Sequence, residues 1–106
     1  MIGRLWHGWT TRANADGYQG MLVREVLPGI ERTEGSRGAY LLRRDVPEGV
    51  EFVTLTLFES MDAVRAFAGE DYTRAVIHKE AGKLLDRFDQ RSEHYEVVFT
   101  PARSRS

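Results

Sequence analysis

The sequence contains no cysteine, which excludes a disulfide framework, a thiolate metal site and a thiol nucleophile. The first residues also lack the basic and then apolar pattern of a secretory signal. Together these two features predict a reduced, cytoplasmic setting. No apolar run approaches the roughly 20 residues that a membrane helix needs, so we expect no membrane association.

Neither sign of charge is in excess. The chain has 15 lysines and arginines against 16 aspartates and glutamates, with a formal net charge of -1. Such a balance provides no basic surface for a phosphate backbone, and we expect no nucleic-acid partner. Glycine-rich phosphate loops and a serine, histidine and aspartate order typical of hydrolases are absent as well.

Histidine is scarce, and its positions argue against a metal centre. The three histidines are His7, His78 and His94, and no pair among them has the spacing of metal ligands. We therefore expect neither a bound metal ion nor an organic cofactor.

The most informative feature that is present is a change of hydrophobic period at Ser60. Residues 52–58 alternate as a strand does, and the apolar residues after Ser60 recur at helical spacing until Gly69. The N-terminal part repeats this order, with a strand over 2–10 and a helix over 16–27. Asp16 is the expected cap of that first helix, and Pro28 with Gly29 is expected to end or kink it.

The remaining pattern completes an α+β fold. Strands over 38–44 and 50–58 flank a turn-rich segment and form a hairpin, a second helix restarts at Asp71 and runs to Phe88, and a last strand covers 93–100. Right-handed crossovers then favour a ferredoxin-like, four-stranded antiparallel sheet with both helical segments on one face. We expect one domain over residues 1–100 and a flexible tail over 101–106.

The alternation of the strands predicts which side chains face the helices. We expect Leu5, His7 and Trp9 on the helix side, with Trp6, Phe52 and Phe58 on the open side. An apolar patch of this kind is unusual on a monomer, so a second subunit should cover it. His94 is expected to point towards that subunit. Two sheets packed face to face would form a homodimeric α+β barrel.

Three segments carry a resemblance to a known family. Residues 55–67, 70–75 and 94–97 resemble the antibiotic-biosynthesis monooxygenase (ABM) domain of the dimeric α/β barrel superfamily. The resemblance spans nearly the whole chain through Thr100. It implies a dimeric barrel with a cleft between sheet and helices, and chemistry that ranges from cofactor-independent oxygenation to haem degradation.

The chain departs from the characterised members of this family. Haem-degrading members have an Asn on the first strand, a Trp on the helix after the third strand and a His on the next helix. The matching positions are His7, Phe67 and His78, so only the histidine is kept, and only if the alignment slips by one residue. The one asparagine, Asn14, precedes the expected first helix.

The candidate cleft residues each allow two interpretations. His7 is either a base towards a phenolic ligand or a histidine bonded to a neighbouring backbone group or carboxylate. Trp9 and Tyr95 either line an aromatic slot or pack as ordinary strand residues. His78 is either a ligand-binding or a surface histidine, and Tyr72 either closes over a ligand or staples the second helix. Phe67 completes the substrate-binding set.

The leading hypothesis is a homodimer that binds a small aromatic or apolar molecule in the cleft. Its reaction would be oxygenation without a cofactor, with His7 as the base that deprotonates the substrate. The first alternative is a non-catalytic ligand-binding or structural dimer. Haem binding or degradation is the third hypothesis.

Overall fold

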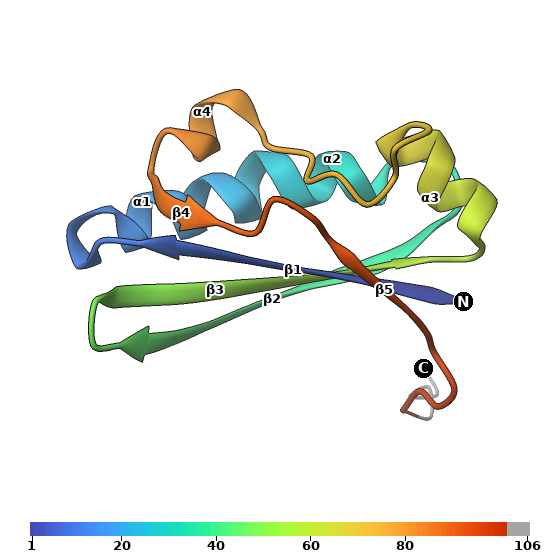
Figure 1. Ribbon diagram of the computed structural model, residues 1–106, viewed down its shortest axis with the longest axis horizontal. Helices are drawn as coiled ribbons and strands as arrows, with labels where there is room; N and C mark the ends of the chain where they lie inside the picture. Colours follow the sequence, from blue (N-terminus) through green and yellow to red (C-terminus); the bar gives the residue numbers. More distant parts are fainter. Residues whose placement is uncertain (102–106) are drawn as a thin grey trace.

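A computed structural model describes residues 1–101 and shows one sheet covered by helices on one face (Figure 1). Of the predicted tail over 101–106, all but Pro101 lies outside the described residues. The elements are β1 (Ile2–Thr10), α1 (Arg12–Met21), the π-helical η1 (Leu22–Val26), α2 (Leu27–Glu31), β2 (Ser36–Val46), β3 (Gly49–Phe58), α3 (Met61–Ala68), α4 (Lys79–Gly82), β4 (Leu85–Phe88) and β5 (Glu93–Glu96).

The sheet is antiparallel, and β1 lies inside it. Its order is β2-β3-β1, and β4 and β5 follow one another along the other edge of β1. β5 pairs with residues 2–5 of β1, whereas β4 pairs with residues 8–10. The predicted ferredoxin-like α+β class is confirmed, with its fourth strand divided into two short pieces.

The first helical segment is longer than the sequence predicted. It begins at Arg12 because the Thr11 hydroxyl accepts a hydrogen bond from the backbone N–H of Asn14, at 3.2 Å. The predicted cap at Asp16 is therefore wrong. The chain also continues helically past Pro28, which lies in the first turn of α2 after the wider π-turns of η1.

The expected helix from Asp71 to Phe88 is the largest error of the sequence analysis. Only α4, a single turn, is helical there, and residues 85–88 form strand β4. Residues 85–88 form backbone hydrogen bonds with the edge of β1. These bonds stabilise the strand more than the apolar stripe, which Gly82 interrupts, would stabilise a helix. By contrast, the predicted Ser60 cap and the end of α3 at Gly69 are confirmed.

The predicted assignment of the two sheet faces is also wrong. Phe52 packs on Tyr18 of α1, with ring centroids 4.9 Å apart, and Phe58 packs on Phe67 of α3 at 5.4 Å. Both phenylalanines are almost fully buried under the helices. Because side chains alternate along a strand, the neighbouring Leu5, His7 and Trp9 of β1 lie on the side without helices.

The side without helices is nevertheless mainly apolar, and we call it the open face. Tyr40 and Leu42 of β2 lie opposite Leu55 and Val53 of β3 and are 54% and 53% exposed. After β5 the chain leads away from the helical layer, and Val98 and Phe99 are the most exposed large apolar residues that the structure describes (Figure 1). The open face contains His7 and the following apolar residues: Leu5, Trp9, Tyr40, Leu42, Val53, Leu55, Leu57, Tyr95 and Val97. Four charged residues share this face: Arg44, Glu51, Arg87 and Glu93.

A truncation tests the corrected assignment of the faces. Phe58→Ala removes a fully buried ring between the sheet and α3, so we expect it to lower the free energy of unfolding by about 3–5 kcal/mol. Val23→Ala, at a position 55% exposed on the helices, should change it by no more than about 0.5 kcal/mol. Urea unfolding measures both. Equal effects of the two substitutions would contradict the burial of Phe58 beneath α3.

Candidate functional site

A narrow cavity lies between the sheet and the helices. Its volume is about 60 Å³ and its walls are mainly apolar. Aromatic rings come from three elements: Trp6 on β1, Tyr18 on α1 and Phe67 on α3. The lining is completed by Arg4, Leu22, Val26, Leu27, Ile30, Thr54, Thr56, Val76, Ile77, His78, Ala81, Gly82, Leu85 and Ser92.

One side of the cavity is lined by Val76, Ile77 and His78, which end a segment over residues 70–78 that we call the wall segment. It contains no regular helix or strand, apart from an isolated bridge between Arg74 and Arg91. Its backbone is tied to the turn between β4 and β5: the N–H of Ala75 donates to Gln90 O at 3.0 Å, and the N–H of Ser92 donates to Thr73 O at 2.6 Å. The wall segment thus depends on tertiary contacts for its shape.

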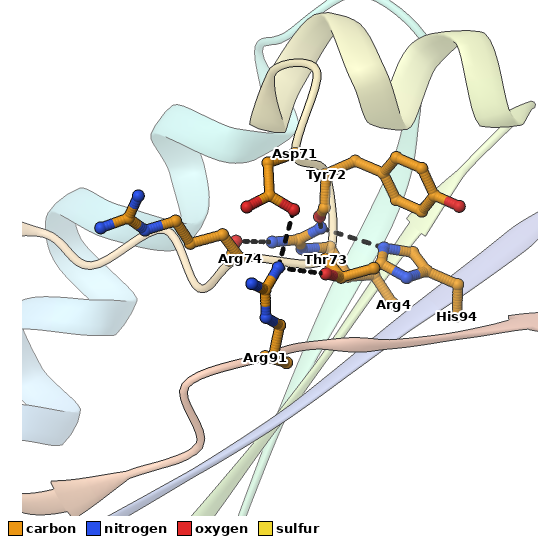
Figure 2. Close-up of polar contacts among 7 residues, drawn as sticks. All are labelled: Arg4, Asp71, Tyr72, Thr73, Arg74, Arg91 and His94. Atoms are coloured by element: carbon orange, nitrogen blue, oxygen red, sulfur yellow. Dashed lines mark hydrogen bonds and ion pairs between the residues drawn. The ribbon is translucent and has the colours of Figure 1, made fainter.

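Arg4 of β1 is the one buried charged group in the lining of the cavity among the described residues, with 5% of its surface exposed. Its guanidinium donates to the backbone oxygens of Tyr72 and Arg74 in the wall segment, the latter at 3.0 Å (Figure 2). It also lies 3.0 Å from Nε2 of His94 and over the ring of Phe67. No carboxylate approaches it within 4.0 Å in residues 1–101.

The neighbouring arginine makes a different set of contacts. Arg91 donates to a carboxylate oxygen of Asp71 and to the hydroxyl of Thr73, both at 2.7 Å (Figure 2). This pair is exposed to solvent, and its stabilising effect is small. Arg91 therefore holds the outside of the wall segment, while Arg4 holds its inside.

His94 of β5 faces Arg4, contrary to the predicted orientation towards a second subunit. Because Arg4 can only donate, Nε2 of His94 accepts and the ring proton lies on Nδ1. Burial of the ring, followed by the positive charge of Arg4, holds the pKa of His94 below its ordinary value of 6.5. The ring also meets Tyr72 edge-on, with ring centroids 5.2 Å apart.

Four of the predicted site residues border a cavity or a depression. Two of them line the cavity, and two border a depression outside it. Phe67 and His78 line the cavity itself. His78 caps α4, with Nδ1 accepting from the N–H of Ala81 at 3.2 Å, so its proton lies on Nε2. Tyr72 and Tyr95 both border a shallow outer depression, which lies against the outer side of the wall segment and also includes Ser92 and His94.

His7 and Trp9 lie on the open face, away from the cavity, so their predicted place in the cleft is wrong. Nδ1 of His7 is 2.7 Å from a carboxylate oxygen of Asp89, which confirms the alternative expectation of a carboxylate partner. Trp9 stacks on His7, and the guanidinium of Arg87 lies 3.8 Å from the centroid of the Trp9 ring. Tyr95 is on the same face and is 52% exposed.

Sequence reasoning missed the residues that give the cavity its polarity and shape. Trp6 was expected on the open side, and Arg4, Tyr18 and Leu22 were not among the expected site residues. A usable signal was present, because an arginine in a strand that is otherwise mostly apolar needs either solvent or partners.

The described residues hold no group of three or more histidine, aspartate or glutamate side chains arranged to bind a metal ion. In the same part of the chain, no helix is both long enough and apolar enough to cross a membrane.

Known structures share this fold, although no family model and no curated protein matches the sequence. A Bacillus cereus protein, named as a candidate antibiotic biosynthesis monooxygenase, has a TM-score of 0.66 and 19% identity, with 99% of this chain and 98% of that chain covered. The haem degrader MhuD of Mycobacterium tuberculosis, with two haems in its active site, has a TM-score of 0.62 and 18% identity. The match covers 96% of this chain and 100% of that chain. A Streptomyces coelicolor monooxygenase from the gene ActVA-Orf6, in complex with nanaomycin D, has a TM-score of 0.59 and 16% identity. The match covers 99% of this chain and 92% of that chain. The protein therefore has the ABM-domain fold.

The environment of His94 predicts a dependence of stability on pH. Its pKa is lower in the folded protein than in the unfolded chain, so the unfolded chain takes up a proton more readily. As the pH falls from about 7 to 5, this group should lower the free energy of unfolding. His94→Gln keeps an acceptor for Arg4 and should show a smaller loss over that range. Denaturant unfolding at several pH values measures the difference, and identical pH profiles would contradict this role of His94.

Proposed function

We propose that the protein binds a small aromatic or apolar molecule in the cleft between sheet and helices. The observation that carries this proposal is the apolar cavity bordered by the rings of Trp6, Tyr18 and Phe67. Aromatic rings around a hollow favour flat, apolar ligands, because the ligand loses its contact with water and gains ring contacts. Two proteins of the same fold support this ligand class, since one holds haem and another nanaomycin D.

Ligand entry requires the cleft to widen. A volume of about 60 Å³ is below the roughly 300–1,000 Å³ of typical small-molecule sites. The wall segment is the part that would move, because it has almost no regular structure and is held by single hydrogen bonds rather than by a helix or a strand ladder. Displacing it outward would join the cavity to the depression beside Tyr72 and His94.

The proposed reaction is oxygenation without a cofactor. In such a reaction an activated methylene of a phenolic substrate becomes a carbonyl, one oxygen atom of O₂ enters the product and the other leaves as water. All four electrons come from the substrate, so the protein has to exclude water, orient the substrate and stabilise its deprotonated form. This scheme no longer relies on His7, whose imidazole lies on the opposite face of the sheet.

Non-catalytic binding is the second candidate function, and one observation favours it. Both histidines beside the cleft already use a ring nitrogen as an acceptor: His78 from the N–H of Ala81 and His94 from Arg4. Neither therefore presents a free basic nitrogen for deprotonating a substrate. Haem binding is the third candidate and would require the ring proton of His78 to move from Nε2 to Nδ1, which would break the hydrogen bond from Ala81.

The two tryptophans provide a test of ligand binding, because they lie on opposite faces. Addition of 4-nitroanisole, a small neutral aromatic probe, should shift the indole N–H signal of Trp6 in an NMR titration and leave that of Trp9 unchanged. Trp9→Phe assigns the two signals. A probe that shifts Trp9 alone, or neither signal at millimolar concentration, would contradict binding in the cleft.

We also propose that a second copy of the chain covers the open face. Tyr40 and Leu42 are more than half exposed in the single chain, and Val98 and Phe99 extend beyond the sheet. A contiguous apolar surface of this kind favours association. Pairing two such faces would produce a barrel with the helices outside, and it would also bury the His7 and Asp89 pair at the interface.

Substitution of Leu42 separates assembly from folding. Because its side chain is 53% exposed in the single chain, Leu42→Glu should leave each subunit folded while placing a charge in the interface. We expect the dissociation constant of the dimer to rise at least tenfold in analytical ultracentrifugation. Val23→Glu, at a helical position that is 55% exposed, is the matched control and should leave the dimer unchanged. A wild-type protein that is monomeric at micromolar concentration would overturn the proposal.

A further inference from the structure

We propose that Arg4 binds an anionic oxygen, a phenolate or a carboxylate, on the aromatic ligand of the cleft. This inference rests on the proposed ligand binding in the cleft and adds the chemical class of the ligand. Arg4 would be the group that distinguishes an anionic aromatic molecule from a neutral one of the same shape.

The first observation is that the charge of Arg4 is buried without a counter-charge. Its surface is 5% exposed, and its recorded partners are two backbone oxygens and a neutral histidine nitrogen. Arginine stays protonated in proteins, so burial cannot remove this charge. Backbone oxygens offset the loss of water only in part, whereas an anion would compensate the charge directly.

The second observation is that the guanidinium has spare donors. Arginine carries five N–H groups, and the recorded contacts of Arg4 involve three of them, two on Nη1 and one on Nη2. Within the described residues, no recorded hydrogen bond uses the N–H of Nε or the second N–H of Nη2. Arg4 belongs to the lining of the cavity, and its contacts with the wall segment and His94 orient the guanidinium (Figure 2). A ligand oxygen in the cavity could therefore accept from a group that is already oriented.

The third observation is that the apolar and cationic parts of the site are adjacent. The guanidinium lies over the ring of Phe67, 5.7 Å from its centroid, and both side chains line the same cavity as Trp6. A flat molecule between these rings would bring a substituent on its edge towards Arg4. In an apolar cleft, hydrogen bonds between a guanidinium and an anionic oxygen are stronger than in water.

Binding of this kind would also serve the proposed oxygenation. A phenolate is the electron-rich form of a phenol, and a fixed positive charge beside its oxygen favours that form without a separate protein base. This is consistent with the two cleft histidines, which have no free acceptor nitrogen.

Arg4 could instead act only as a support for the wall segment, through the carbonyls of Tyr72 and Arg74. The two roles predict different ligand preferences. A support would affect neutral and anionic ligands equally, whereas an anion-binding group affects only the anionic one.

The experiment compares 4-nitrophenol, ionised at pH 8, with its neutral methyl ether 4-nitroanisole. Affinities are measured from the NMR shift of the Trp6 indole N–H, and the phenolate absorption band gives the pKa of bound 4-nitrophenol. For the wild type we expect at least tenfold tighter binding of the phenolate and a lower pKa of the phenol when bound. Arg4→Met should abolish the preference, and Arg4→Lys should keep part of it. Arg37→Met, which removes an exposed arginine paired with Glu59, is the control and should retain the full preference.

The outcomes separate this inference from the proposed function. Equal affinity of the wild type for the two probes, with the Trp6 signal shifting for both, would overturn the role of Arg4 and leave ligand binding in the cleft intact. A preference that persists in folded Arg4→Met would also overturn it. If neither probe shifts the Trp6 signal, both the cleft and the anion site are refuted. Because the comparison of the two probes uses the wild type, it decides the question even if Arg4→Met fails to fold.

Discussion

The position of β1 inside the sheet is the constraint on which the rest of the structure depends. All nine of its residues pair with β3, and its other edge pairs with β4 and β5. Since neighbouring side chains of a strand point to opposite faces, this one register places Arg4 and Trp6 under the helices and His7 and Trp9 on the open face. If the register of β1 shifted by one residue, the side chains of β1 that face the cleft and those on the open face would change places.

The same strand brings a permanent charge into the interior. Arg4 is buried at the point where β1 meets the wall segment, and it is held by backbone oxygens and His94. The wall segment has little structure of its own, so its position depends on this guanidinium and on its hydrogen bonds to the turn between β4 and β5. A ligand that attracts Arg4 would therefore act on the wall segment as well, which connects recognition of the ligand with opening of the cleft.

The two faces of the sheet divide the proposed tasks between them. The helix side provides an apolar, aromatic cavity lined by one buried cation, which suits a ligand, whereas the open face provides an exposed, mainly apolar surface, which suits a second copy of the chain. His7 belongs to the second group, where Asp89 and Trp9 are its partners. In the proposed dimer, His7 would lie at the subunit interface.

The sequence by itself determined the strands over 2–10 and 50–58, the hairpin, the Ser60 cap and the ferredoxin-like order, because each depends on local periodicity or on a cap within a few residues. The spacing of the apolar residues before Phe88 predicted a helix. Residues 85–88 instead form β4, because they pair with the edge of β1. Among the residues that line the cavity, Phe67 and His78 were expected from the sequence, whereas Arg4 and Trp6 were not. Both faces of β1 and β3 carry large apolar residues, so alternation alone could not say which face the helices would cover. That choice was made by the packing of Tyr18 and Phe67 against Phe52 and Phe58, and contacts between residues so distant in the sequence exist only in the tertiary structure.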